Sequence, residues 1–324
     1  MNSTLDAAQN SVLNPTHTPT NNPSPNPTQT PAPSPSQNPR LAALTIQARL
    51  AALLPADALL LGEQHDNPDH QRIEREVVQA LSASGQLAAV VIEMAAQGNS
   101  SVHLAASATE DAVKNALNWD DKAWPWSVYA GPILAAVRAG VPVVGANLPR
   151  AQLRAAMADS TLDQRLNADA LKRQNQLIRE GHCDLLPESQ ITPMTRVQIA
   201  RDVAMAGVIS EEVKKAATHA VAKMVDGAAN GAVAGTVGGT QGGVVTAAEP
   251  RPKTVLLIAG SGHVDTALAV PRHLPPGVTS RSVLLSANRP GSAATKADGF
   301  DAVWPTGATP DKDYCAQLKK NLGQ

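Results

Sequence analysis

Two short segments of the chain share the pattern Gly-x-x-His, and each begins where a run of apolar residues ends. The first is Gly62-Glu63-Gln64-His65 and the second is Gly260-Ser261-Gly262-His263. Glycine suits a backbone that turns sharply at the end of a strand, because it has no Cβ. If the two apolar runs are neighbouring strands of one parallel sheet, both imidazoles and the Glu63 carboxylate lie at one edge of that sheet. The pattern therefore predicts a site built from distant parts of the sequence.

The residue types at this edge suit metal binding or acid–base chemistry. Neutral imidazole binds iron, zinc and manganese, and a carboxylate adds negative charge and accepts harder ions. The candidate metal ligands are Glu63, His65, Glu93 and His263. The structural alternatives are that Glu63 caps the following helix and that Glu93 forms an internal ion pair with Arg72 or Arg150. His70 does not have the spacing from His65 that places two groups on one helical face, so we expect it at a helix start, facing solvent or the sheet.

Short apolar runs and helical stretches alternate after Pro39, and these elements must position the site. The predicted strands are residues 57–61, 87–92, 141–144, 253–258, 282–285 and 302–304. The predicted helices around them are residues 40–54, 67–81, 111–117 and 131–139, and a closing helix from Asp311. Continuous apolar strands separated by helices are typical of a parallel sheet covered on both faces. We therefore predict an α/β fold, mainly parallel, flanked by helices.

In such a sheet, ligands bind beyond the carboxyl ends of the strands. Polar side chains gather there: Glu63, His65, Glu93, Asn147, His263, Ser286 and Asn288. The pattern of apolar runs thus predicts this edge of the sheet without any use of the polar residues that lie on it.

The remaining segments differ in composition from this α/β core, which comprises residues 40–150 and 253–324. Residues 1–39 are rich in proline and predict a disordered arm. Residues 151–226 predict a helical insertion, with long helices over 151–180 and from 194 to about 225. Residues 227–252 are rich in glycine and alanine and predict a flexible loop.

Charge and cysteine content exclude several classes of protein. A net charge of −1 gives no general attraction to nucleic acid. Cys183 and Cys315 are isolated, which disfavours a zinc ribbon and a disulfide framework, and a single bridge between them would matter only after export. No apolar run approaches the ~20 residues of a transmembrane helix. No basic start with an apolar core precedes Arg40, so the sequence taken literally predicts a cytoplasmic protein.

Aromatic side chains cluster in one short stretch of a chain with only 2% aromatic residues. They are Trp119, Trp124, Trp126 and Tyr129. Such a group could form the wall of a slot for a flat macrocycle, and Tyr129 could supply a phenolate as axial ligand of a haem iron. The alternative is that these rings only seal the sheet edge against its helices.

Several motifs in order along the chain resemble those of the ChaN-like haem-binding proteins. They are Leu60-Leu61-Gly62-Glu63-Gln64-His65-Asp66-Asn67-Pro68-Asp69-His70, Val91-Ile92-Glu93-Met94, Asn118-Trp119-Asp120, Trp126 with Tyr129, Gly145-Ala146-Asn147-Leu148-Pro149-Arg150, Ala259-Gly260-Ser261-Gly262-His263 and Val270-Pro271-Arg272. The resemblance extends from about Leu41 to the C-terminus, apart from the glycine-rich loop. The family is similar to a wider group with paired Gly-x-x-His motifs, including Tiki metalloproteases, TraB-like proteins and erythromycin esterases.

The resemblance implies an α/β fold with a helical insertion and a haem-binding lipoprotein of the bacterial envelope that acts in iron or haem uptake. Two departures stand out: no lipoprotein signal with an acylated cysteine is present, and Ala269 replaces a glycine that often precedes the Val-Pro-Arg element.

Two functions are therefore consistent with the residues at the strand ends. In the first, haem or another tetrapyrrole binds at the strand ends near His65, Glu93, Trp126, Tyr129, Asn147 and His263. A homodimer around haem and an outer-membrane haem or iron receptor are the partners that this interpretation allows. In the second, a divalent Zn, Mn or Fe ion activates water for amide or ester hydrolysis, with Glu63 as general base, or His65 acts as the base without metal. The motifs along the whole chain favour haem.

Overall fold

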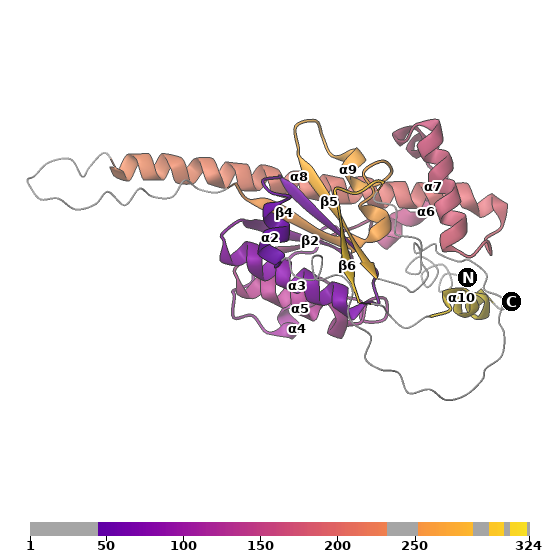
Figure 1. The fold of residues 1–324 in the computed structure, drawn as a ribbon, viewed down its shortest axis with the longest axis horizontal. Coiled ribbons are helices and arrows are strands. Elements are labelled where there is room, and N and C mark those ends of the chain that lie inside the picture. The colour runs from indigo at the N-terminus through magenta and orange to yellow at the C-terminus, as the bar shows by residue number, and fades with distance from the viewer. Residues whose placement is uncertain (1–44, 232–251, 288–297, 308–311, 323–324) are drawn as a thin grey trace, which may run out of the picture.

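A six-stranded sheet with the order β3-β2-β4-β1-β5-β6 organises the chain (Figure 1). This computed structural model describes residues 45–231, 252–287, 298–307 and 312–322. The strands are β1 (Ala58–Glu63), β2 (Leu87–Ala96), β3 (Val143–Asn147), β4 (Thr254–Gly260), β5 (Ser280–Ala287) and β6 (Ala302–Thr306). All five pairings between neighbouring strands are parallel. The predicted α/β class with a parallel sheet is confirmed.

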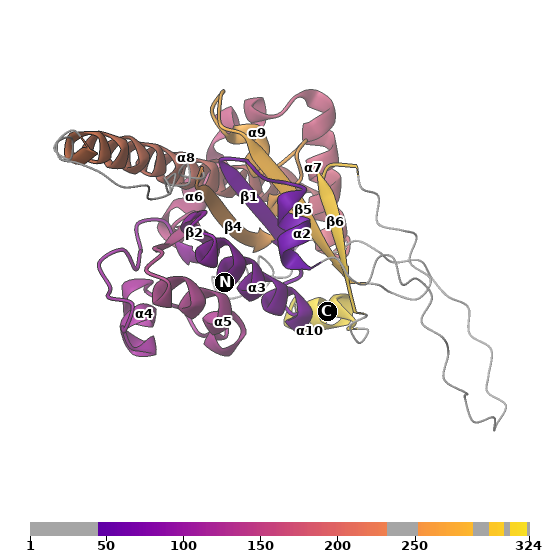
Figure 2. The same cartoon turned by 60° about the vertical axis from the view of Figure 1, so that its left-hand side comes forward.

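Helices cover both faces of the sheet (Figure 2), so the central strands β1 and β4 are buried on both sides. Alternate residues of β1 divide between the two faces: Leu59 and Leu61 pack in the cluster with α3 (Pro68–Ala83) and α5 (Trp126–Arg138). Ala58 and Leu60 pack in the cluster with Met205 and Ile209 of α8 (Glu188–Gly231). The smaller helices are α2 (Ile46–Ala51), α4 (Glu110–Ala116), α9 (Val270–His273) and η3 (Ser261–His263).

The register of β1 and β4 places the two Gly-x-x-His motifs side by side. Gly62 pairs with Ala259, and Glu63 pairs with Gly260, so both strands end at the same level. The close approach explains the first glycine, since a Cβ on Gly62 would lie 2.3 Å from the Val264 Cγ2 atom. On its other side β4 neighbours β2, which contains Glu93.

The region between β3 and β4 is helical, but the single helix predicted over residues 151–180 is wrong. The chain forms η1 (Arg150–Gln152), α6 (Leu153–Ala158), η2 (Ser160–Arg165) and α7 (Ala168–Gly181). The breaks occur where Asp159 accepts a hydrogen bond from the Thr161 backbone N and Asn167 accepts one from the Ala170 N. These side chains offer the backbone an alternative to helix continuation and cap the next helix.

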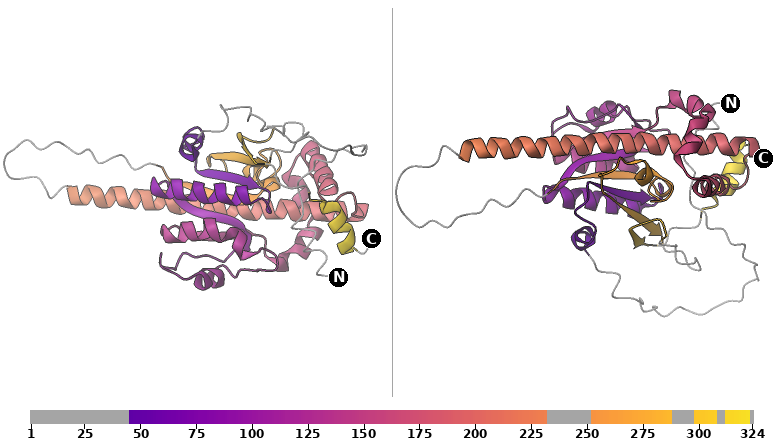
Figure 3. Two further views of the ribbon diagram at one scale, coloured as in Figure 1. Left: turned by 60° about the horizontal axis from the view of Figure 1, so that its bottom comes forward. Right: turned by 90° about the horizontal axis from the view of Figure 1, so that it is seen from above.

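The second long helix, α8, lies along one face of the sheet and extends beyond it (Figure 3). It continues to Gly231, into the segment predicted as a loop, and residues 232–251 lie outside the described residues. The predicted N-terminal arm and Asn288 also lie outside them. None of the helices in the described ranges is long and apolar enough to span a membrane.

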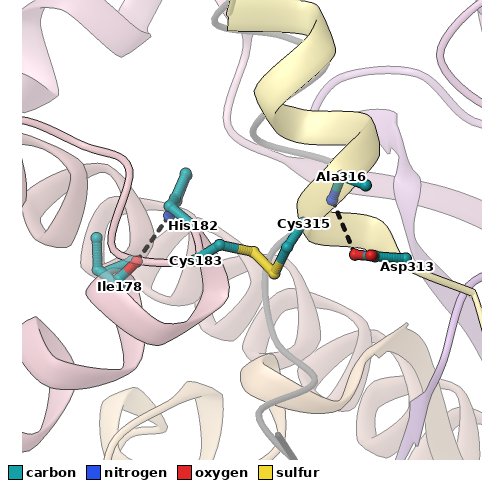
Figure 4. The surroundings of a disulfide bond; sticks show 6 residues. All are labelled: Ile178, His182, Cys183, Asp313, Cys315 and Ala316. Carbon is teal, nitrogen blue, oxygen red and sulfur yellow. Dashed lines mark hydrogen bonds between the residues drawn. A yellow bond between two sulfur atoms is a disulfide. The ribbon is translucent and has the colours of Figure 1, made fainter. Parts of the chain in front are cut away.

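The C-terminal helix α10 (Tyr314–Leu322) is joined to the end of α7 by a disulfide between Cys183 and Cys315 (Figure 4). This single bridge connects residues that are 132 positions apart in the sequence.

Candidate functional site

The carboxyl ends of β1, β2 and β4 bring His65, Glu93 and His263 together. The Nε2 atom of His65 lies 3.7 Å from Glu93 Oε2, and the Nε2 atom of His263 lies 3.4 Å from Glu93 Oε1. One buried carboxylate therefore lies between two imidazoles from distant parts of the chain, as the two motifs predicted.

Glu93 is held as a carboxylate by its surroundings. Burial raises its pKa, but the charges of His263 and His65 and the hydrogen bond from the Gly260 N, 2.8 Å long, lower it well below its ordinary value. The predicted alternative of an ion pair with Arg72 is wrong, because Arg72 binds Glu76 and Asp69 on the surface of α3.

His65 is oriented by contacts on both sides of its ring. Its Nδ1 lies 2.9 Å from Glu63 Oε1, and its ring meets the edge of Trp124 with the centroids 4.8 Å apart. The Nε2 side faces Gly260, where a Cβ would lie only 2.7 Å from Nε2. Burial lowers the pKa of His65, but Glu93 and Glu63 raise it, and the net direction is upward. The side chain is 21% exposed, compared with 6% for His263.

Glu63 does not cap the helix after β1, so that alternative is also wrong. Asn67 caps α3 by accepting a hydrogen bond from the Asp69 backbone N. Glu63 instead accepts hydrogen bonds from Gln71 Nε2, at 2.5 Å, and from the Tyr129 hydroxyl, at 2.9 Å. Its role in the structure is to hold the His65 imidazole.

Tyr129 is 1% exposed and contributes its hydroxyl as a donor to Glu63. Burial, together with the nearby charge of Glu63, raises the pKa of this phenol far above its ordinary value. Tyr129 is therefore a neutral phenol in this structure, with its hydroxyl bonded to Glu63 and 3.2 Å from His65 Nδ1.

Glu74 is a site residue that the sequence analysis missed. It is fully buried on α3, and burial, with the charge of Glu63, raises its pKa well above the ordinary value. Neither carboxyl oxygen of Glu74 has a hydrogen-bond partner among the described residues. Burial also raises the pKa of Glu63, but its contacts with His65 lower it, and the net direction is downward. These shifts favour the protonated form of Glu74 and the ionised form of Glu63.

His263 is held from α8 by two further residues that sequence reasoning missed. Its Nδ1 lies 2.6 Å from Asp202 Oδ1 and 3.1 Å from Gln198 Nε2. Burial lowers the pKa of His263, but Glu93 and Asp202 raise it to about 10, so the ring is an imidazolium at neutral pH. Burial also raises the pKa of Asp202 to about 6. The spacing of Gln198 and Asp202 places both on one helical face, but nothing in the sequence indicated that this face meets His263.

The other predicted site residues have contacts of their own. Trp126 donates its indole N–H to Glu110 and packs on Trp119, so Trp124 is the indole that contacts His65. Asn147 ends β3, and its Oδ1 has no hydrogen-bond partner among the described residues. Ser286 lies on β5, where its carbonyl accepts a hydrogen bond from Thr306.

A metal-ligand set is not formed by these side chains. Within the described parts of the chain, no three His, Cys, Asp or Glu side chains are arranged to hold a metal ion. Of the proposed ligands, Glu63 is engaged by Gln71, Tyr129 and the Nδ1 atom of His65. The arrangement therefore gives no support to the metal-dependent hydrolase considered from the sequence.

Residues 49–228 match the family model described as haem-binding uptake, Tiki superfamily, ChaN. The chain belongs to the ChaN family. Its fold is similar to that of ChaN of Campylobacter jejuni, a structure described as showing cofacial haem binding, with a TM-score of 0.55 and 21% identity over 79% of this chain and 90% of that one. The type III effector HopBA1 aligns with a TM-score of 0.42 and 15% identity over 84% of this chain and 100% of that one. No curated protein sequence matches the chain.

The donor chemistry of this ChaN-family site fits haem. A haem iron commonly takes one axial imidazole, and a ligating histidine usually has its other ring nitrogen held by a carboxylate or carbonyl. His65 has this arrangement, with Glu63 on Nδ1 and an indole beside the ring. His263 also has a carboxylate at each ring nitrogen but is only 6% exposed, compared with 21% for His65, so His65 is the imidazole that a ligand reaches more easily.

Proposed function

We propose that the chain binds haem at the carboxyl edge of its sheet, with His65 as the imidazole that holds the iron, and that it handles haem in bacterial iron uptake. The observation that carries the proposal is the arrangement of His65. This ring is partly exposed at the edge of the sheet, fixed through Nδ1 by Glu63, and packed against Trp124. His65 would hold the haem, which would supply a Lewis-acidic iron at this edge of the sheet.

The residues around His65 prepare it for this role. Gln71 and Tyr129 hold the carboxylate of Glu63, which in turn fixes the ring. The raised pKa of His65 means that Nε2 must lose a proton before it can bind iron. We therefore expect hemin affinity to increase as the pH rises through the pKa of His65.

The test is a titration of the full chain with hemin, followed by the Soret band. We expect His65→Ala to lower hemin affinity about tenfold or more, the equivalent of about 1.4 kcal/mol or more, and to shift the band. His103→Ala, which alters an exposed histidine in the loop after β2, is the matched control and should behave like the unaltered chain.

Tyr129→Phe separates the two possible iron ligands. If this variant loses the Soret shift and His65→Ala keeps it, the iron is bound by Tyr129 and the assignment to His65 is wrong. If the unaltered chain shows no Soret shift, haem binding itself is refuted. Because the His65 side chain is partly exposed, we also propose that a second copy covers the outer side of the haem. Light scattering should then show twice the mass when hemin is added.

A further inference from the structure

The C-terminal segment contacts both residues that flank His65. The Tyr314 hydroxyl donates to Asp66 Oδ2 at 2.5 Å and accepts a hydrogen bond from Gln64 Nε2 at 3.1 Å. Lys312 Nζ lies 2.6 Å from the same Asp66 oxygen. Residues close to the end of the chain are thus bonded to the loop between β1 and α3, which presents His65.

The disulfide holds this segment in place from the opposite side. Cys315 directly follows Tyr314, and its partner Cys183 belongs to a turn that is fixed without the disulfide (Figure 4). In that turn the Cys183 N donates to the Glu180 carbonyl and the Asp184 N donates to the Arg179 carbonyl, each at 2.9 Å. Cys183 is therefore the fixed end of the bridge, and the position of Tyr314 depends on it.

Helix α10 is short and mostly exposed. It has nine residues, and among residues 314–320 only Leu318 is buried. A helix this short is marginal in water unless tertiary contacts stabilise it. Both cysteines are only partly buried, so a small reductant can reach the bridge.

We propose that Tyr314 is a positioning residue for His65 and that the Cys183–Cys315 disulfide makes this positioning sensitive to redox conditions. A dithiol reductant transfers two electrons and two protons, so that the S–S bond breaks, two cysteine thiols form and the reductant becomes a disulfide. Helix α10 then loses its covalent anchor, Tyr314 leaves Asp66 and Gln64, and the loop that presents His65 becomes mobile. Together with the proposed function, on which it rests, this redox sensitivity predicts that haem is held firmly in an oxidising compartment and released more readily under reducing conditions.

The first experiment uses the full chain without haem, so that its outcome does not depend on haem binding. Amide hydrogen exchange of the 64–67 loop is measured before and after reduction with a dithiol. We expect exchange to become about fivefold faster or more on reduction, the effect of losing one net hydrogen bond. Tyr314→Phe should give the same increase while the disulfide is intact, and reduction of that variant should add little, because the two changes act through one contact.

Gln317→Ala is the matched control, since it alters an exposed residue of the same helix. Exchange in the 64–67 loop should be unchanged in this variant. Cys183→Ser with Cys315→Ser should reproduce reduction if the variant folds, and Tyr314→Phe keeps the test decisive if it does not. Equal exchange in the oxidised, reduced and Tyr314→Phe proteins would overturn the proposal.

The second experiment measures release of hemin to an excess of an apo haem acceptor. We expect release to become about fivefold faster on reduction and in Tyr314→Phe, but not in Gln317→Ala. A chain that binds no hemin but shows the predicted exchange pattern contradicts the proposed function and leaves the positioning role intact. Hemin release that is independent of reduction, in a chain that does bind hemin, overturns the redox inference alone.

Discussion

Acidification should weaken the folded state through one buried histidine, His70, which lies beside the site. It is fully buried, its Nδ1 accepts a hydrogen bond from the Gln64 backbone N at 2.9 Å, and its Nε2 lies 3.1 Å from Thr306 Oγ1. Because Nδ1 must be an acceptor, the ring is neutral and Nε2–H donates to Thr306. Protonation of Nδ1 would place a hydrogen against the Gln64 N–H and break the link between the end of β1 and β6.

The size of this effect follows from the pKa of His70. Burial lowers it from 6.5 to about 4, with partial opposition from the charges of Glu63, Asp69 and Asp66. Between these values the unfolded chain binds a proton and the folded chain does not, so stability falls as the pH falls. At 1.36 kcal/mol per pH unit the loss reaches about 3 kcal/mol by pH 4, and above pH 6.5 the effect is absent.

Urea unfolding of the oxidised chain, followed by circular dichroism from pH 7.5 to pH 4, tests this expectation. His70→Asn retains an acceptor near the position of Nδ1 but does not titrate. As the pH falls from 7.5 to 4, the free energy of unfolding of the unaltered chain relative to that of this variant should decrease by most of about 3 kcal/mol. His219→Asn, at an exposed position on α8, is the control for the substitution itself. A pH-independent difference for His70→Asn would show that the buried ring is not kept neutral.

Three further predictions concern the two strand ends. Gly260→Ala introduces a Cβ 2.7 Å from His65 Nε2, so hemin titration should show about tenfold weaker binding, with the far-ultraviolet circular dichroism unchanged. Asp202→Asn leaves His263 without its closest anion. The pKa of His263, measured by NMR titration, should fall from about 10 in this variant. Urea unfolding at pH 7 should show a loss of about 3 kcal/mol in the free energy of unfolding. Gly62→Ala places a Cβ 2.3 Å from a methyl group of the segment after β4, which should cost about 2 kcal/mol in urea unfolding.

The strands and the edge that they form could be predicted from sequence because local patterns determine them. The central strands β1 and β4 are apolar up to their Gly-x-x-His motifs, and parallel strands of this kind end at one edge, although β2 continues past the predicted end to Ala96. This rule alone predicts that His65, Glu93 and His263 lie close to one another. The helical insertion was harder, since Asp159 and Asn167 break a pattern that hydrophobic spacing alone reads as continuous.

The residues that support the histidines depend on contacts between elements, and periodicity does not specify which element meets which. Tyr129 lies on α5 and reaches Glu63 across the α3 face of the sheet, while Asp202 reaches His263 from the helix on the other face.

One signal for the missed residues was nevertheless present in the sequence. Glu74 directly follows Ile73 on α3, and both side chains are buried. A carboxyl group at a buried helical position must be neutral or paired, because an isolated charge there is too costly. Glu74 is neutral for this reason, and the charge of Glu63 at the end of the preceding strand adds to the effect of burial. A carboxyl residue on an apolar helical face thus indicates a buried group close to the site, even when its contacts cannot be derived from the sequence.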